Sequence, residues 1–219
     1  DPNSITVPEL KAALRAGIIS LRAFGVLCGS ALKYVGVQTV LDAVIDYLPC
    51  PTERPDVEGT DIRDPNIKLT RPHSENAPFS ALVFKVVSDV AGTLTYLRVY
   101  SGKLVKGSRV LNPGNDRKEN VSRLYEMHSQ HRNALDETGP GQIVAVVGLK
   151  DSFTGDTLCD LDHPIVLERM VFPEPVISMS IEPNTADDKK KLGEALTTIR
   201  REDPSFRSNY NEETGETII

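Results

Sequence analysis

The chain has 219 residues, a net charge of −6 and a pI of about 5.3. The acidic balance argues against a chain that binds nucleic acid over its whole surface, and no apolar run of about 18 residues is present that would span a membrane. Its three cysteines lack Cys-x-x-Cys spacing, which argues against a disulfide framework or a zinc site and favours a reducing, cytoplasmic compartment.

The first 48 residues have the pattern of an α/β fragment. Residues 5–17 are predicted to form a helix with Pro8 in its first turn, where a missing N–H costs little. The run "AFGVLCGSA" has the length of a buried strand. After Gly36, apolar residues recur on one helical stripe that Pro49 ends.

The next segment, residues 49–78, contains six prolines separated by charged and turn residues. Proline is excluded from helix interiors and from central strands. This pattern predicts a linker or an extended crossing between domains, with no helix and no central strand.

From Phe79 the pattern is that of a β-barrel or sandwich of about 95 residues. Short β-rich runs such as "FSALVFKVV", "TLTYLRVYSG" and "GQIVAVVGL" alternate with turn glycines. From Pro175 the order changes to strand, helix, strand and turn, with Thr185 or Asp187 as helix cap. That order is the opening of a ferredoxin-like sandwich.

Charge is unevenly distributed within the β-rich part. Residues 98–132 contain eight basic and three acidic residues, a net of +5, whereas residues 136–168 contain seven acidic and one basic, a net of −6. A basic patch is the electrostatic footprint of a phosphate backbone. Tyr96, Tyr100 and Tyr125 lie among these charges. The alternative is an ordinary solvated face of the barrel.

No residue pattern indicates catalysis or metal binding. The chain lacks a Gly-x-x-x-x-Gly-Lys-[Ser/Thr] phosphate loop and a Gly-x-Ser-x-Gly elbow. His128 and His131 are three residues apart but have no carboxylate or cysteine at ligand spacing. We therefore expect no metal site and assign no catalytic residue.

Five stretches together resemble bacterial elongation factor G, a family of translational GTPases that move tRNA and mRNA through the ribosome. They are "VLCGSALKYVGVQTVLDAVIDYLP", "FSALVFKVVSD", "LRVYSGKL", "VGLKDSFTGDTLCD" and "FPEPVISMSIEP…DPSF…NEETGETII". The resemblance covers nearly the whole chain, and the stretches occur in the order of the family.

The resemblance implies a multi-domain, mainly β fold with α+β parts, and an internal fragment of a longer protein. Residues 1–73 would be the α/β end of a P-loop GTPase domain plus a Pro-rich linker. Residues 74–173 would be a six-stranded translation-factor-type barrel, similar to the second domain of elongation factor Tu. Residues 174–219 would be an incomplete ferredoxin-like third domain, which we expect either to be loosely held or to pack on a symmetry partner.

The resemblance also implies one nucleotide contact. Gly29-Ser30-Ala31 resembles the family's Ser-Ala-x motif, whose strand-to-helix turn presents backbone N–H groups to guanine. Ser30, Ala31 and Leu32 would be the remnant of that guanine site, although Leu32 departs from the Phe or Lys common in the family. The full-length parent would bind GTP or GDP with Mg²⁺ and hydrolyse GTP. The fragment, which lacks the phosphate loop, would be inactive and bind no cofactor.

The implied partner of the fragment is the ribosome, through small-subunit rRNA. We expect a cytoplasmic monomer with no membrane contact, whose barrel contacts phosphates through Arg98, Lys103, Lys106, Arg109, Arg117, Lys118 and Arg123. Two alternatives stay open. One is a sister ribosomal GTPase, acting in recycling, ribosome protection or peptide release. The other is a stand-alone, non-catalytic binding module.

Overall fold

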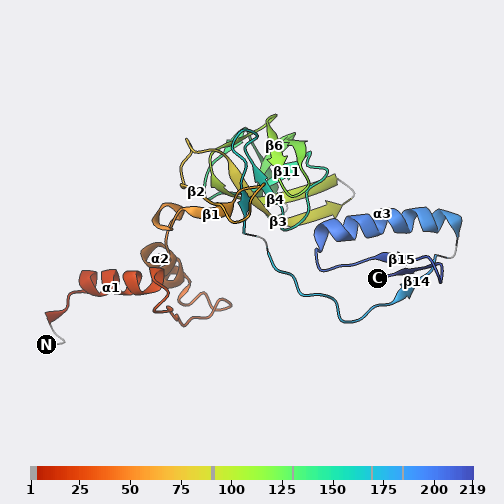
Figure 1. Ribbon diagram of the computed structural model, residues 1–219. Helices are drawn as coiled ribbons and strands as arrows, with labels where there is room; N and C mark the ends of the chain where they lie inside the picture. The colour runs from red at the N-terminus through yellow and green to blue at the C-terminus, as the bar shows by residue number, and fades with distance from the viewer. Residues whose placement is uncertain (1–3, 90–91, 130, 169, 184) are drawn as a thin grey trace. The chain divides into compact units, whose positions relative to one another are not determined.

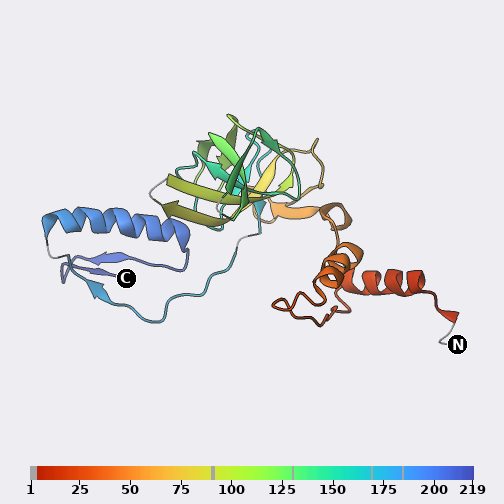
Figure 2. The ribbon, with the colours of Figure 1, turned by 180° about the vertical axis from the view of Figure 1, so that it is seen from behind.

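The computed structural model describes residues 4–89, 92–129, 131–168, 170–183 and 185–219. The chain separates into two compact units, residues 1–54 and 55–219 (Figures 1 and 2). Residues 1–3 of the first predicted domain lie outside the described residues. Within the described ranges, no helix combines the length and the apolar character needed to cross a membrane.

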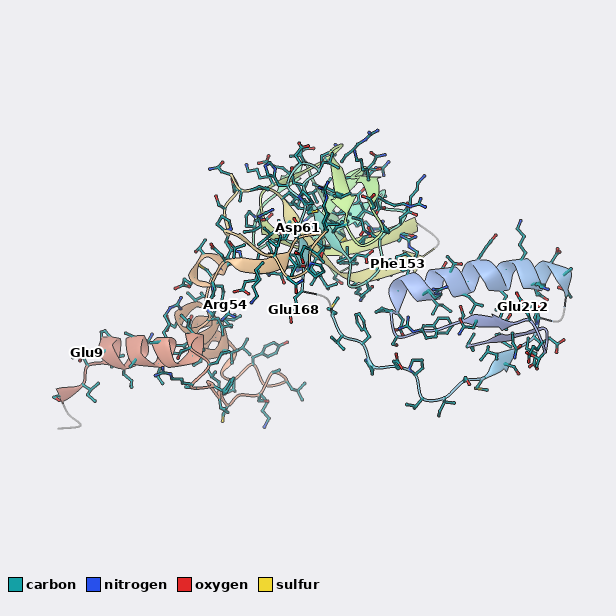
Figure 3. The ribbon with its side chains drawn as sticks, in the orientation of Figure 1. Glu9, Arg54, Asp61, Phe153, Glu168 and Glu212 are labelled. Atoms are coloured by element: carbon teal, nitrogen blue, oxygen red, sulfur yellow. The ribbon has the colours of Figure 1, made fainter. Side chains whose placement is uncertain are left out.

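Among its described residues, the first unit contains the helices α1 (Val7–Ile19) and α2 (Val37–Tyr47) and the 3-10 turn η2 (Pro51–Glu53). The α1 helix begins two residues later than predicted. Its start is fixed by Glu9, whose carboxylate accepts the Thr6 N–H at 2.8 Å and the Thr6 hydroxyl at 2.7 Å (Figure 3). These bonds satisfy polar groups that the first turn of a helix leaves open.

The strand predicted for the run "AFGVLCGSA" is wrong. Residues 23–29 form no strand, and the only pairing described in this stretch is an isolated bridge between Ser30 and Val35. A strand needs a neighbour for its backbone ladder, and the described part of this unit supplies none. The apolar side chains of this run are therefore exposed to solvent, and Val26 is 89% exposed.

Ion pairs rather than a core connect α1 to the residues that follow it in this unit. Ala43 is the only buried hydrophobic residue among those described here. Lys11 Nζ lies 2.5 Å from Asp46 Oδ2. Arg15 donates to both carboxylate oxygens of Glu53 at 2.7 Å, and also to the Asp46 carbonyl at 2.8 Å.

The second unit opens with a three-stranded sheet that the proline pattern did not predict. Its order is β13-β1-β2, with β1 (Val57–Thr60), β2 (Lys68–Arg71) and β13 (Val166–Leu167). The expectation of no central strand in residues 49–78 is therefore wrong, because β1 pairs on both sides. Pro55, Pro65 and Pro72 flank the strands instead of interrupting them.

The largest sheet has eight antiparallel strands in the order β7-β6-β12-β3-β4-β11-β8-β9. Its strands are β3 (Ser80–Asp89), β4 (Gly92–Ser101), β6 (Arg109–Asn112), β7 (Arg117–Asn120), β8 (Arg123–His128), β9 (His131–Leu135), β11 (Ile143–Val147) and β12 (Thr157–Cys159). A separate pair joins β5 (Leu104–Val105) to β10 (Glu137–Thr138). β7 and β9 are polar in sequence, so apolar alternation could not indicate them.

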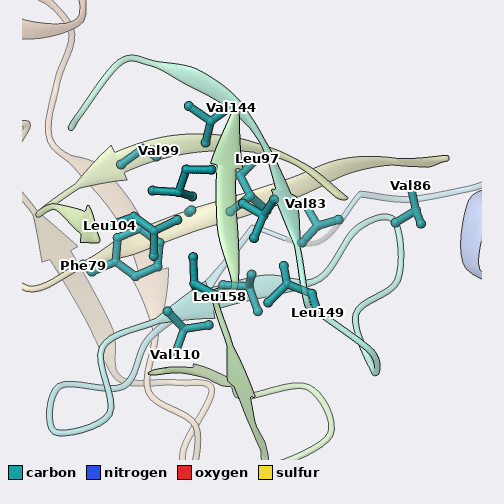
Figure 4. Close-up of a cluster of buried hydrophobic side chains, with 14 residues drawn as sticks. Phe79, Val83, Val86, Leu97, Val99, Leu104, Val110, Val144, Leu149 and Leu158 are labelled. Carbon is teal, nitrogen blue, oxygen red and sulfur yellow. The ribbon is translucent and has the colours of Figure 1, made fainter. Parts of the chain in front are cut away.

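One hydrophobic cluster indicates that this sheet curls around a common core, in agreement with the expected barrel, although the sheet has eight described strands where six were expected. The cluster contains Val110 of β6 and Leu124 of β8, which are far apart in the strand order. It also contains the fully buried Val83, Leu97 and Leu158 from the strands between them (Figure 4). A flat sheet would not bring these side chains together, and enclosure of one core by alternate residues is the barrel arrangement.

A second cluster covers part of the outside of the barrel. It joins Leu111 and Cys159 of the eight-stranded sheet to Ile165 and Leu167, with Tyr100 packed against it. Burial raises the pKa of the Cys159 thiol. The β13-β1-β2 sheet thus lies on one part of the outer barrel surface and leaves another part for other contacts.

The C-terminal segment contains β14 (Ser180–Ile181), α3 (Ala186–Glu202), β15 (Asn209–Asn211) and β16 (Glu216–Ile218). The sheet order is β14-β16-β15, which agrees with the predicted β-α-β-β opening. Thr185 caps α3 by accepting the Asp188 N–H at 3.1 Å. None of the described residues of α3 is buried.

The end of α3 is tied to the loop between β11 and β12, which Phe153 marks in Figure 3. The last carbonyls of a helix lack partners within it. Here Thr154 supplies them, donating its N–H to the Arg201 carbonyl at 3.2 Å and its hydroxyl to the Glu202 carbonyl at 3.1 Å. Arg201 in turn donates to the Leu149 carbonyl at 3.2 Å.

Candidate functional site

The first candidate site is the tight turn that precedes α2. Ser30 and Val35 exchange two backbone hydrogen bonds, of 2.9 and 3.1 Å, and the Tyr34 N–H donates to the Ala31 carbonyl at 3.2 Å. Tyr34 and Gly36 adopt positive φ values of 55° and 77°. Residues 31–34 therefore form the tip of a closed turn, with Leu32 at 90% exposure.

Close backbone contact explains the glycines of this turn. A Cβ on Gly29 would lie 2.8 Å from the Val35 carbonyl oxygen, and one on Gly36 would lie 3.0 Å from that of Cys28. Because the Ser30 and Tyr34 N–H groups donate within the turn, the backbone donors that remain for a ligand lie at the tip and include those of Ala31 and Leu32. An exposed pair of amides can donate to acceptors on one edge of a planar base.

The second candidate site is the set of seven basic residues on the barrel. The structure distributes them over three groups of elements. Lys103 and Lys106 lie on the turns around β5, and Arg98 and Arg123 lie on β4 and β8. The remaining three lie on the β6–β7 hairpin, namely Arg109, Arg117 and Lys118.

Three of the seven are paired with acids. Lys103 Nζ lies 2.9 Å from Glu137 and 3.1 Å from Glu75. The hydrogen bond to Glu137, followed by the one to Glu75, raises the pKa of Lys103. The two carboxylates leave this cluster with a net negative charge. Lys106 lies 3.3 Å from Asp136. Arg117 lies 3.6 Å from Asp151, so these cations contribute little positive field.

The other four basic residues make no ion pair within the described residues. Arg109 donates from Nε to the Asn120 side-chain oxygen at 3.1 Å, which leaves its charge uncompensated. Lys118 and Arg123 are exposed, and Arg98 is half-buried on the outer face of β4. Of the seven candidates, those whose positive charge is available to a polyanion are therefore Arg98, Arg109, Lys118 and Arg123.

Sequence reasoning missed the residue that organises this region, Glu119. It lies between Arg117 and Asn120 on β7 but is only 4% exposed. Its carboxylate accepts the Asp151 N–H at 2.8 Å, and also accepts from the Lys150 N–H and the Ser152 hydroxyl. No sequence signal distinguishes it from its exposed neighbours in "DRKEN".

The histidine pair is a strand contact. His128 and His131 face each other across the β8–β9 hairpin. Among the residues that the structure describes, no group of three His, Cys, Asp or Glu side chains is arranged to hold a metal ion.

Comparison with known proteins defines the class. Residues 78–161 match the family model "Elongation factor G domain 2", and residues 172–219 match "Elongation Factor G, domain III". The barrel and the C-terminal segment are thus domains of a translation elongation factor.

Comparisons over the whole chain agree with these two domain matches. The chain is 50% identical over 212 residues, or 96% of its length, to elongation factor G of Ureaplasma parvum serovar 3 and to that of Ureaplasma urealyticum serovar 10. A Thermus thermophilus protein of known crystal structure superposes with a TM-score of 0.73 at 26% identity, over 98% of this chain and 30% of that one. The chain belongs to the elongation factor G family. It spans about 30% of the length of these curated relatives.

Proposed function

We propose that this chain is part of a cytoplasmic elongation factor G that binds GTP and the ribosome and promotes translocation of tRNA and mRNA. Its share of that work is to position the factor on small-subunit rRNA through the barrel. The observation that carries the proposal is the set of four basic side chains without acid partners among the described residues, on strands of a domain that belongs to this family. Phosphate contacts of this kind fix orientation without reading sequence.

We also propose that the turn at Ser30–Leu32 holds one edge of the guanine base. GTP with Mg²⁺ supplies the phosphoanhydride bond that the whole factor would cleave. This chain's own part is to present the Ala31 and Leu32 amides, whose neighbours are held by the Ser30–Val35 bonds. The chain offers no phosphate loop, so we assign no catalytic residue to it.

Charge reversal tests the rRNA contact. The double variant Arg98→Glu/Arg123→Glu should bind small ribosomal subunits more weakly and flatten the plot of log affinity against log salt by about 1 to 2, since each lost phosphate contact removes about 0.7 to 0.9 from the slope. Lys106→Glu is the matched control, because Asp136 already compensates Lys106. Wild-type affinity in the double variant, or an equal loss in the control, would contradict the proposal.

A further inference from the structure

We propose that the outer face of β4, β11 and β8 is a stacking surface for unstacked nucleotides of single-stranded RNA. In this arrangement Tyr96 and Tyr125 take bases, and Arg98 and Arg123 take the adjoining phosphates. The inference deepens the proposed rRNA contact and rests on it.

The strand register puts the two tyrosines in one row. Ala145 of β11 pairs with Tyr96 of β4 on one side and with Tyr125 of β8 on the other. Directly paired residues of antiparallel strands point to the same face of a sheet. Their neighbours Leu97 and Leu124 point into the barrel core, so this row faces outward.

The burial of Ala145 indicates how the rings lie. Ala145 is 0% exposed although it belongs to the outward row, while Tyr96 and Tyr125 on either side are half-buried. Side chains that cover their neighbour in this way lie along the sheet. The Tyr96 ring is also braced by Phe84, whose centroid is 6.3 Å away at an interplanar angle of 53°.

Cations surround this row. Arg98 follows Tyr96 by two residues and Arg123 precedes Tyr125 by two, so both lie on the same face as the tyrosines. Lys85, which pairs with Tyr96, has its Nζ over the Tyr96 ring at 6.0 Å from the centroid, so a base that stacks on this face would displace the ammonium group. Glu126, the one acidic residue of β8, directly follows Tyr125 and therefore points to the opposite face of the sheet. The described outward positions of β4, β8 and β11 carry no carboxylate.

This combination fits single-stranded RNA better than duplex RNA. Proteins hold unpaired bases by stacking them on aromatic rings, with cations along the backbone, whereas a duplex shows its phosphates but hides its base faces. Tyr96 and Tyr125 lie two strands apart, about 10 Å, so each ring would take a different base.

The test measures binding of the full chain to an eight-nucleotide uridine-rich strand and to an RNA duplex with the same number of phosphates. Tyr96→Leu/Tyr125→Leu should weaken single-strand binding on the order of tenfold or more and leave the salt slope unchanged. Tyr96→Phe/Tyr125→Phe keeps the rings and should retain the affinity. Tyr210→Leu, at a 57% exposed tyrosine of β15, is the control and should bind as wild type.

Different failures are distinguishable. If the Leu variant binds like wild type while Arg98→Ala/Arg123→Ala loses affinity and salt slope, the stacking inference is overturned but the phosphate contact stands. If neither pair of changes affects binding, both proposals are overturned. If a polyglutamate peptide binds as tightly as the single strand and responds equally to the Leu variant, the surface binds acidic protein and the RNA inference is overturned.

Discussion

At the scale of single residues, Glu119 shows how the barrel fixes the loop that α3 contacts. Its buried carboxylate accepts from Lys150, Asp151 and Ser152 on one side of this loop. Arg201 of α3 donates to the carbonyls of Leu149 and Ser152 from the other side. A buried charge is tolerated only when its oxygens are well supplied with donors, and this loop supplies them.

Glu119→Ala should destabilise the barrel by about 3 kcal/mol, because it leaves two part-buried backbone N–H groups and a buried hydroxyl without their acceptor. Urea unfolding of the chain measures this loss. Glu126→Ala, at an exposed carboxylate on β8, is the matched control and should change the free energy of unfolding by less than about 0.5 kcal/mol. Equal midpoints for the two variants would show that Glu119 is not needed.

The residue scale is also where the sequence is least informative. The same composition that identifies seven basic candidates does not show that Lys103, Lys106 and Arg117 have acid partners. Those partners, such as Asp136 and Asp151, come from segments 28 to 34 residues away. Pairing of this kind depends on strand register, which the sequence pattern leaves open.

At the scale of elements, local signals predict the helices better than the strands. Helix starts and ends are encoded by nearby residues such as Pro8, Thr185 and Pro49, and the predicted helices are present, although α1 is shifted by two residues from its predicted range. A strand depends on a distant partner, so the apolar run at 23–31 forms none, whereas the proline-rich segment contains the central β1. The polar strand β7 could be found only from its pairing with β6.

Acid should loosen the link between α1 and η2. Hydrogen bonds from the Arg15 guanidinium and, to a smaller extent, from the Cys50 N–H lower the pKa of Glu53 from the ordinary 4.5 to about 2. A lowered carboxyl pKa stabilises the folded state above pH 4.5, and this stabilisation is lost as pH falls towards about 2. The Arg15 Nε–Hε NMR signal should therefore shift in that window, and in Glu53→Gln it should not.

Glu9→Gln is the control for this titration. The pKa of Glu9 is also lowered, by the hydrogen bond from the Thr6 hydroxyl, but this bond lies in the first turn of α1, away from Arg15. The variant should keep the wild-type Arg15 transition. The proposed pairing of Glu53 with Arg15 would be contradicted if, in the wild type, the Arg15 signal completed its shift at or above the ordinary glutamate pKa.

At the scale of the whole molecule, periodicity and turn residues are sufficient to predict a mainly β chain with α+β parts, and five stretches in family order are sufficient to predict the family. The matches to two elongation factor G domains and the 50% identity to Ureaplasma relatives support that conclusion independently. The sequence could not predict which side chains lie together on the outer face of the barrel. The row formed by Tyr96, Ala145 and Tyr125 joins residues up to 49 positions apart.

The measurement that tests the central claim most directly is oxidative footprinting of side chains, with and without small ribosomal subunits. A barrel that contacts rRNA through β4, β11 and β8 predicts that Tyr125 and Met127 become protected when subunits are added, while Tyr210 reacts as before. Unchanged reactivity at Tyr125 and Met127, in a chain that has bound the subunits, would contradict the account and place the contact elsewhere.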